Sequence, residues 1–423
     1  MVASAYIHIP FCRRRCFYCD FAISVVGDRK RGDTSATIGQ YVRTLLQEIQ
    51  AAPKLNSAPL QTVFFGGGTP SLLAVSQLDA ILQAIDQRFG IAANAEISME
   101  MDPATFDSQH LQGYQQAGVN RVSLGAQDFE DEVLAASGRF HRQADIFHAV
   151  DLLQQANIAN FSLDLMSGLP HQTLESWQSS LDRVIALQPS HISQYDLIVE
   201  PQTAFARYYT PGEAPLPSDD HTAQMYRMAQ EALTAGGYDH YEICNYAQPG
   251  GEAKHNITYW KNQPCYGFGM GATSYLPLDS GYQRIDRPRT QRSYRAWVED
   301  FISQGGDTND PVLSPEERVL EGIMVGLRLA EGLPLEEIHA VYGDQGLVAI
   351  ETAIAPHVQS NWAIVSTPHS PRPTPYSLPF TPSNVTNLNP TSYIHLTDPE
   401  GFLMSNVVIV DTFNALEALR NNV

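Results

Sequence analysis

The sequence predicts an α/β fold, an incomplete (β/α)6 TIM-like barrel with a smaller C-terminal α+β domain. Two observations predict it. Short apolar runs alternate with helical patterns over about the first two hundred residues, and this alternation is typical of a parallel sheet covered by helices. The strand–helix units number about six, too few for a closed eight-stranded barrel. We expect the barrel at residues 1–210, a linking region at 211–310 and the C-terminal domain at 311–423.

Each strand of the barrel is expected at a short apolar run. In chain order the runs are Ala5–Ile9, Thr62–Gly67, Glu96–Met101, Arg121–Gly125, Asn160–Leu165 and His191–Leu197. Helices are expected between them, for example at Gln77–Phe89 and Gln143–Ala156, and Gly27–Gly39 is expected to be a surface loop. Because the working residues of such barrels lie at the C-terminal ends of the strands, a site is expected there.

The rest of the chain is predicted from caps and composition. Asp219–Gly236 is expected to be helical, and Ser314, with Pro315 and Glu317 after it, forms a capping box that opens the C-terminal domain. Tyr393–Asn406 is expected to be a strand, a turn and a second strand, and Val407–Arg420 a closing helix. Residues 366–392 are rich in Pro, Ser, Thr and Asn, which predicts a disordered or extended insertion.

Composition limits the class of protein. At 43% hydrophobic and 17% charged residues the chain is expected to be soluble and globular, and no apolar run approaches the roughly 18 residues of a membrane span. A net charge of −20 argues against a nucleic-acid partner. With no recognisable export signal and an odd count of five cysteines, a cytoplasmic protein with metal chemistry is expected rather than a disulfide framework.

Three of the five cysteines stand together. Cys12, Cys16 and Cys19 form C-x3-C-x2-C directly after the first expected strand, a spacing that lets one loop wrap three thiolates around one metal centre. Structural zinc would need a fourth ligand from Cys244 or Cys265, which otherwise are ordinary buried thiols. A [4Fe–4S] cluster held by three cysteines would leave one iron open. Both metal hypotheses remain, and incidental buried thiols are the alternative to them.

Polar and glycine residues follow the other expected strands. The glycine run of Phe64–Pro70 lets a backbone come close to a ligand, although a tight turn has the same composition. Residues on successive strands predict a ring around a small ligand. They are Tyr6, Gly67, Glu100, Gln127 and Asp164, with Arg139 twelve residues after Gln127.

These motifs together resemble the radical S-adenosylmethionine (SAM) enzymes. In that family the C-x3-C-x2-C loop holds a [4Fe–4S] cluster, SAM chelates the open iron, and reduction splits SAM into methionine and a 5′-deoxyadenosyl radical. The resemblance implies an aromatic contact to the adenine, contacts to the amino and methionine end from the glycine run, and contacts to the sugar and carboxylate from Gln127, Arg139 and Asp164. The implied SAM residues are Tyr6, Tyr18, Gly66, Gly67, Gly68, Thr69, Glu100, Gln127, Arg139 and Asp164.

Within that family the chain is most similar to the oxygen-independent coproporphyrinogen III oxidase group, in its HemW-type branch of haem chaperones. The oxidase pattern is C-x3-C-x2-C-x-C, and Phe21 stands where its last cysteine would fall. Only eleven residues precede Cys12, where the oxidase has a long segment that takes part in catalysis. Both departures argue against decarboxylation. The resemblance also implies a winged-helix-like C-terminal module, and the acidic chain argues against DNA as its partner.

The segment His255–Trp260, "HNITYW", matches the H-N-x-x-Y-W motif that this branch associates with haem binding. An imidazole is a common axial ligand of haem iron, and aromatic rings offer flat apolar area to a porphyrin. The implied haem residues are His255, Asn256, Tyr259 and Trp260. A hydrogen-bonded core histidine beside packed aromatic residues is the alternative.

The sequence therefore predicts a haem chaperone rather than an enzyme. It would bind haem together with a [4Fe–4S] cluster and SAM and deliver haem to acceptor proteins, with respiratory or membrane-bound enzymes as candidate acceptors. An electron donor to the cluster and a homodimer are further expected partners. The alternative is a radical SAM enzyme that decarboxylates coproporphyrinogen III to protoporphyrinogen IX, and a zinc-binding scaffold is the third hypothesis.

Overall fold

The computed structural model describes residues 1–366 and 388–420 and divides into two compact units. The first unit comprises Met1–Tyr238, Ala247–His255 and Pro264–Val312, and the second comprises Asp239–Tyr246, Asn256–Gln263 and Leu313–Val423. The boundaries predicted at residues 210 and 310 stay a prediction. No helix within the described ranges has both the length and the apolar character needed to cross a membrane.

The first unit is built on a parallel sheet whose strands run in the order β11-β1-β4-β5-β6-β7-β8. The strands are β1 (Ser4–Ile9), β4 (Leu60–Gly67), β5 (Ile91–Met101), β6 (Arg121–Gln127), β7 (Phe161–Ser167), β8 (His191–Asp196) and β11 (Tyr266–Phe268). This order is linear and does not return to its start, so the predicted incomplete barrel is confirmed. Each predicted strand overlaps an observed one.

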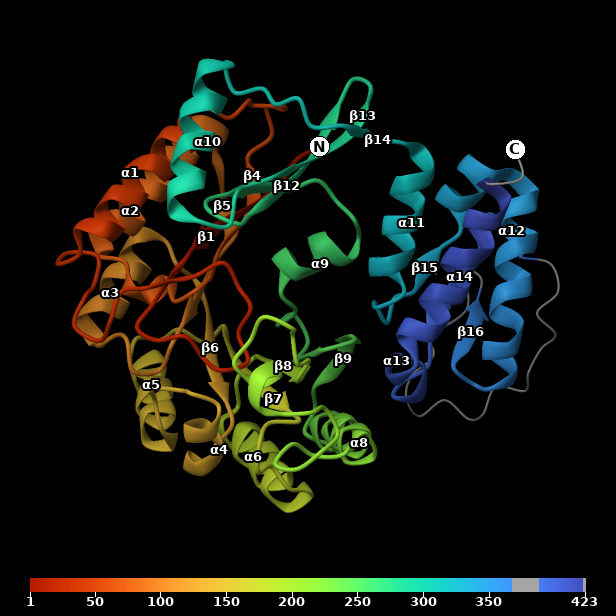
Figure 1. Ribbon diagram of the computed structural model, residues 1–423, viewed down its shortest axis with the longest axis horizontal. Helices are drawn as coiled ribbons and strands as arrows, with labels where there is room; N and C mark the ends of the chain where they lie inside the picture. Colours follow the sequence, from red (N-terminus) through yellow and green to blue (C-terminus); the bar gives the residue numbers. More distant parts are fainter. Residues whose placement is uncertain (367–387, 421–423) are drawn as a thin grey trace. The chain divides into compact units, whose positions relative to one another are not determined.

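Helices cover the outer face of this sheet (Figure 1). They are α1 (Ala36–Ala51), α2 (Val75–Phe89), α3 (Ser108–Ala117), α4 (Asp131–Ala136), α5 (Gln143–Gln155), α6 (Leu174–Leu187), α8 (Asp219–Ala235) and α10 (Gln291–Ser303). Strand side chains alternate between two faces, and those facing the helices, such as Ile7, Phe65 and Leu163, are fully buried. The core of the unit therefore lies between strands and helices.

The inner face of the sheet is more polar. Parallel register aligns Tyr6 with Phe64, Phe64 with Ser98, and Ser98 with Arg121. One step nearer the C-terminal ends, Glu100 aligns with Ser123 on the next strand. Side chains of these residues face the inside of the half-barrel, where the site is expected.

Short elements complete the first unit. They are β2 (Phe11–Cys12), β3 (Ser24–Val25), the 3-10 turn η1 (Pro70–Leu72), α7 (Phe205–Tyr208), β12 (Thr273–Leu278) and β13 (Gly281–Asp286), with β14 (Val312–Leu313) beside β13. The surface loop predicted at Gly27–Gly39 ends earlier than expected, because the Ser35 hydroxyl caps the amide of Ile38 and α1 begins at Ala36.

The second unit combines helices with a small antiparallel sheet of order β15-β17-β16, as expected of the winged-helix-like α+β domain. Its elements are β9 (Asp239–Glu242), β10 (Asn245–Ala247) except for Ala247, α11 (Pro315–Gly326), β15 (Leu333–Pro334), α12 (Glu336–Gln359), β16 (Ala363–Ser366), β17 (Tyr393–Leu396), α13 (Glu400–Leu403) and α14 (Ser405–Arg420). The predicted capping box at Ser314 is confirmed. The short helix α9 (Lys254–Trp260) begins in the first unit and continues in the second.

One predicted element of the second unit is wrong. Tyr393–Asn406 contains a single strand, β17, followed by α13 and the start of α14 rather than by a second strand. The Thr397 hydroxyl accepts a hydrogen bond from the Gly401 amide at 2.9 Å in the first turn of α13, and Phe402 is buried. Of the predicted insertion at 366–392, residues 367–387 lie outside the described residues.

Candidate functional site

The cysteine loop leaves the C-terminal end of β1 and is fastened at three places. β2 and β3 pair in parallel, with Cys12 opposite Val25. The amide of Phe17 donates to the carbonyl of Ser137 at 3.1 Å, and the amide of Phe205 donates to the carbonyl of Phe17 at 3.0 Å. Backbone hydrogen bonds from three parts of the chain therefore hold the loop at the predicted edge of the sheet.

The three thiols of this loop are free and partly buried. Burial raises the pKa of Cys12 to about 12; the Thr69 hydroxyl, 3.7 Å from the Cys12 sulfur, opposes this, and the neighbouring thiols of Cys16 and Cys19 add to it. Burial also raises the pKa of Cys19. The thiolates repel one another without a cation, and a metal centre would reverse that penalty.

The thiols share a loop without forming a ligand set. In the part of the chain that the structure describes, no three Cys, His or acidic side chains are arranged to hold a metal ion. The sulfur of Cys265 donates to the carbonyl of Tyr266 at 3.2 Å and is buried. The assignment of Cys12, Cys16 and Cys19 as ligands therefore remains a proposal, supported by their shared loop and mutual repulsion.

The glycine run after β4 is required by close packing against the protein itself. A Cβ at Gly66 would lie 2.9 Å from the ring of Tyr6, and one at Gly68 would lie 2.8 Å from the carbonyl oxygen of Phe11. Gly67 has φ +110°, a conformation that other residues avoid, and a Cβ there would lie 2.5 Å from the ring of His8. The predicted close approach thus involves β1 and the start of the cysteine loop.

Two buried carboxyl groups lie near this run: Glu100 is on β5 and Asp164 is on β7, with β6 between the two strands. Burial raises the pKa of Glu100 to about 8, with nearby Asp164 adding to the shift and the hydrogen bond from the Gly67 amide at 3.0 Å opposing it. Burial also raises the pKa of Asp164, against hydrogen bonds from neighbouring serine hydroxyls. Ser123 donates to Asp164 at 2.9 Å and Ser162 at 3.2 Å.

Arg139 supplies the opposite charge at the same edge. Its Nη2 donates to Asp102 Oδ2 at 3.0 Å and to the carbonyl of Gly125 at 2.7 Å, and its Nη1 donates to the Cys16 sulfur at 3.5 Å. Its Nε is buried and has no hydrogen-bond partner in the described structure. Burial alone would raise the pKa of Asp102, but Arg139 and His141 hold that pKa well below its usual range.

Gln127 ends β6 with a strained backbone. Its φ of +69° is uncommon for a residue other than glycine, and the β6–β7 register shifts between Leu124 and Gln127. Its side-chain oxygen Oε1 is buried and accepts no hydrogen bond from any described residue. An unsatisfied buried acceptor of this kind calls for a donor such as a hydroxyl group.

These groups fit SAM. A zwitterionic amino-acid end needs anions for its ammonium and a cation for its carboxylate, which Glu100 and Arg139 could supply, and ribose hydroxyls need acceptors such as Gln127 and Asp164. Thr69 is tied to the loop through its contact with Cys12. Tyr18 packs on Phe205 with ring centroids 6.2 Å apart. The fit rests on the chemistry of the donor set and on the unsatisfied atoms of Arg139 and Gln127.

The predicted residue Tyr6 lies deeper inside the half-barrel. Its hydroxyl is 3.0 Å from His8 Nδ1, and its ring stacks on Phe64 with centroids 6.1 Å apart. Burial raises the pKa of Tyr6 well above its ordinary value, and the Glu100 carboxylate adds to the shift. Tyr6 therefore packs against the glycine run and lies near Glu100.

The predicted haem residues fall in different surroundings. His255 is 1% exposed, its Nδ1 is 2.8 Å from the Thr62 hydroxyl, and its ring stacks on Phe64 at 5.1 Å. Burial lowers the pKa of His255 to about 3, so its imidazole is neutral. Tyr259 is 41% exposed. Coordination of haem by His255 stays a prediction, and the structure places this histidine as the core alternative describes.

The other haem residues of α9, Asn256 and Trp260, belong with Tyr259 to the second unit. The guanidinium of Arg328 lies 6.0 Å from the centre of the Trp260 ring. Such a cation over an aromatic face is worth on the order of 0.5–1 kcal/mol when exposed. Trp260 is thus partly engaged by its own unit.

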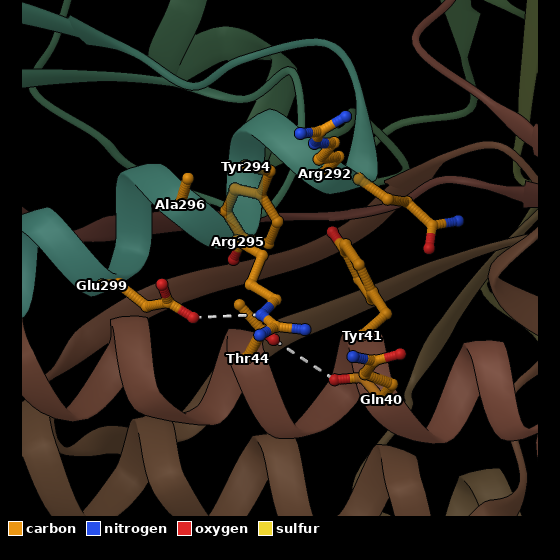
Figure 2. A pocket seen from close by; sticks show the side chains of 9 residues that line it. Gln40, Tyr41, Thr44, Arg292, Tyr294, Arg295, Ala296 and Glu299 are labelled. Carbon is orange, nitrogen blue, oxygen red and sulfur yellow. Dashed lines mark hydrogen bonds and ion pairs between the residues drawn. The ribbon is translucent and has the colours of Figure 1, made fainter.

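A pocket lies away from all of these residues. It occupies about 440 Å³ between α1 and α10, and its polar floor is already committed, as Figure 2 shows for Thr44. The hydroxyl of Tyr41 donates to the carbonyl of His8, that of Tyr294 donates to Glu48, and that of Thr44 donates to the carbonyl of Gln40. Arg295 pairs with Glu299. Because the hydroxyl groups of this pocket already donate hydrogen bonds to other protein groups, we do not take the pocket as the candidate site.

Sequence reasoning missed four contributors to the site. Asp102 directly follows the end of β5, so proximity to a strand end was an available signal for it, whereas His141 lies between α4 and α5 and carries no such signal. Ser162 carries no such signal, because a serine in a strand is ordinary. Phe205 touches the cysteine loop from a segment about 190 residues later, which only the fold brings together.

Comparison with known proteins supports these features. Residues 6–184 match the radical SAM superfamily. A Synechocystis protein named heme chaperone HemW is 44% identical over 417 residues, covering 99% of this chain and 98% of that protein. Proteins of the same name from Bacillus subtilis and Escherichia coli are 36% and 35% identical, each over 80% of this chain, covering 87% and 86% of their own lengths.

A solved structure supports the fold. The E. coli coproporphyrinogen III oxidase HemN, described as a radical SAM enzyme, matches with a TM-score of 0.72 at 22% identity, over 98% of this chain and 89% of that one. At this identity the likeness concerns the fold alone. The chain is thus similar in sequence to proteins named heme chaperone HemW and similar in fold to a coproporphyrinogen III oxidase.

Proposed function

Because the chain belongs to the radical SAM superfamily and, within it, to the family whose curated members are named heme chaperone HemW, we propose that it binds haem and transfers it to acceptor proteins. The observation that carries this proposal is the 44% identity to one such protein along nearly the whole length of both chains. Phe21 supports it. This side chain is 61% exposed and offers no thiol at the place where the oxidase pattern has its last cysteine.

A [4Fe–4S] cluster and SAM accompany this function. When bound, the reduced cluster supplies an electron that can cleave the sulfonium bond of SAM. We propose that Cys12, Cys16 and Cys19 ligate the cluster, that Glu100 holds the amino group and Arg139 the carboxylate of SAM, and that Gln127 and Asp164 hold its hydroxyls. The polar, water-poor strand ends around Glu100 keep these groups oriented.

Haem itself is the cargo, and the motif on α9 is the proposed place of contact. Tyr259 presents exposed aromatic area, and the neutral imidazole of His255 could ligate iron once exposed. Acceptors among respiratory or membrane-bound enzymes, an electron donor to the cluster, a homodimer and a cytoplasmic location complete the proposal. It describes a carrier rather than an enzyme.

The test compares carriage with catalysis in one preparation. The full chain is reconstituted anaerobically with iron and sulfide, titrated with haem, and then mixed with a haem-free globin as acceptor. We expect a saturable Soret change followed by transfer of haem to the globin. In parallel the same protein receives SAM, a reductant and coproporphyrinogen III.

The outcomes separate the two functions. Formation of protoporphyrinogen IX at enzymatic turnover rates would contradict the haem-carrier proposal and support the oxidase function. Failure to bind haem in a preparation that holds its cluster would also remove it. Cys244→Ser is the control variant for changes in the cysteine loop such as Cys16→Ser. The Cys244 thiol lies outside that loop, so its loss should leave the cluster in place.

A further inference from the structure

Beside the cysteine loop lies a buried charged group of three side chains, of which the sequence motifs assign only Arg139. It consists of Asp102, Arg139 and His141, whose side chains are 20%, 11% and 0% exposed. Asp102 follows the end of β5, and the other two lie between α4 and α5. Burying three ionisable side chains away from water costs free energy unless they pair with one another or with a ligand.

The donors of Arg139 can be followed one by one. A guanidinium has five N–H groups and accepts nothing. Nη2 is directed to Asp102 and the carbonyl of Gly125, and Nη1 faces the sulfur of Cys16. The Nε–H is buried and has no partner among the described residues. One arginine therefore reaches the cysteine loop with one edge and keeps a free donor.

Asp102 and His141 hold this orientation. His141 Nε2 donates to the carbonyl of Ala126 at 3.0 Å, which fixes the ring against β6. Its Nδ1 then lies 3.5 Å from Asp102 Oδ1 and 3.4 Å from Arg139 Nη2. The carboxylate of Asp102 supplies the countercharge that a buried guanidinium requires. The three side chains form a continuous series of contacts from β6 to the Cys16 sulfur.

We propose that Asp102 and His141 are positioning residues that hold Arg139 as a bridge between the Cys16 sulfur and the carboxylate of SAM. The inference goes beyond haem transport and does not depend on it. Its consequence is a coupling: one guanidinium donates both to a cluster ligand and to the bound cofactor. Because hydrogen bonds to cluster sulfurs influence the electronic state of a cluster, SAM binding is expected to be sensed there through Arg139.

The first measurement is SAM affinity of the anaerobically reconstituted full chain by calorimetry. Asp102→Asn keeps the size of the side chain and removes its charge, so Arg139 loses its anchor. A hydrogen bond between charged groups is worth enough to weaken SAM binding about ten- to a hundredfold when lost. Asp107→Asn is the matched control, since Asp107 also pairs with a histidine, His110, but on the exposed surface of α3.

The decisive measurement is a double-mutant cycle. If Asp102 acts through Arg139, then Asp102→Asn has no further effect on SAM affinity in an Arg139→Gln background. The spectroscopic companion is the change that SAM causes in the paramagnetic resonance spectrum of the reduced cluster. We expect this change at saturating SAM to be reduced in Asp102→Asn and normal in Asp107→Asn.

Two results would overturn the proposal: a SAM affinity of Asp102→Asn within about twofold of the parent, or an equal loss in both backgrounds. Iron content and apoprotein unfolding are recorded for every variant. Where Asp102→Asn does not retain iron, the same cycle with His141→Gln decides, because glutamine can keep the donor to Ala126 and lacks the Nδ1 contact. Haem titration of these variants should be unchanged, which separates this outcome from the proposed carrier function.

Discussion

At the scale of single residues, burial in the first unit changes the protonation of two side chains, Glu100 and His255. Glu100 is fully buried beside a second buried carboxyl, and its pKa is raised to about 8. His255 is equally buried, and its pKa is lowered to about 3. In the absence of ligand both side chains are therefore neutral near pH 7. Of the two, only Glu100 has a pKa near neutral pH, so pH dependence is expected at the end of β5.

The first prediction concerns Glu100. Its folded pKa lies above the ordinary value of 4.5, so the folded chain binds a proton more tightly than the unfolded chain does. The stability that this proton provides is complete below pH 4.5 and is lost as pH rises through about 8. Glu100→Gln should remove a slope of up to about 1.4 kcal/mol per pH unit from the unfolding free energy of the apoprotein.

Denaturant unfolding between pH 5 and pH 8, a window on the order of the shift just described, measures this slope. Glu213→Gln, at an exposed turn position, is the control and should leave the pH profile of the parent intact. An identical slope in Glu100→Gln and the parent would show that Glu100 does not carry the buried proton.

The second prediction concerns His255. Removing a buried ring and leaving the Thr62 hydroxyl without its partner should destabilise the apoprotein by about 2–4 kcal/mol in His255→Ala. Chemical unfolding of the haem-free chain measures this, with exposed His221→Ala as control. The haem complex of the same variant tests ligation: an unchanged Soret band would remove His255 from the haem site while leaving its packing role.

At the scale of elements, the cysteine loop depends on the short helix α7. Phe205 is 1% exposed, and it packs with Val133 and Leu169 while its ring contacts Phe17 and Tyr18. Its amide also donates to the loop carbonyl of Phe17. A four-residue helix far along the chain thus provides one wall of the predicted cluster site.

The third prediction follows from this wall. Phe205→Ala keeps the backbone hydrogen bond but removes the packed ring, which should destabilise the chain by about 3–5 kcal/mol and speed the loss of reconstituted iron to a chelator. Tyr208→Ala on the same helix is the control, because Tyr208 is 76% exposed. Equal rates of iron loss in both variants would contradict a role for Phe205 in holding the loop.

At the scale of the whole molecule, the cysteine loop and the core of the first unit are separable. The thiols are attached to the C-terminal edge of a sheet whose stability comes from side chains such as Ile7, Phe65 and Trp177, all fully buried away from the loop. The parallel strands and their helices form the frame, and the loop adds chemistry to one edge. Loss of the metal centre should therefore leave the fold standing.

The fourth prediction tests this separation. Cys16→Ser should lose most of the iron after reconstitution, while the circular dichroism and thermal unfolding of the apoprotein match those of the parent. Cys244→Ser should keep the iron. A zinc site completed by Cys244 would instead show equal loss of metal in both variants, and a collapsed fold in Cys16→Ser would show that the loop is part of the core.

The sequence was informative wherever a feature depends only on residues that are neighbours along the chain. The strands from Ala5–Ile9 to His191–Leu197 were predicted because short apolar runs between helical patterns need no tertiary information, and the capping box at Ser314 is purely local. The second strand expected after Tyr393 was wrong, since the burial of Phe402 on α13 depends on three-dimensional packing. Asp102 and His141 were missed because their importance lies in contacts with Arg139, which no spacing displays.

By itself, then, the sequence determined the parallel half-barrel, the cysteine loop and the strand-end residues, because alternation and motif spacing are properties of neighbouring residues. Only the tertiary structure decided that His255 is buried against Phe64, that Phe205 closes the cysteine loop, and that Arg139 is held by Asp102 and His141. The physical reason is common to all three. Burial and the pairing of charges join segments distant along the chain, and they acquire their energy only when water is excluded between them.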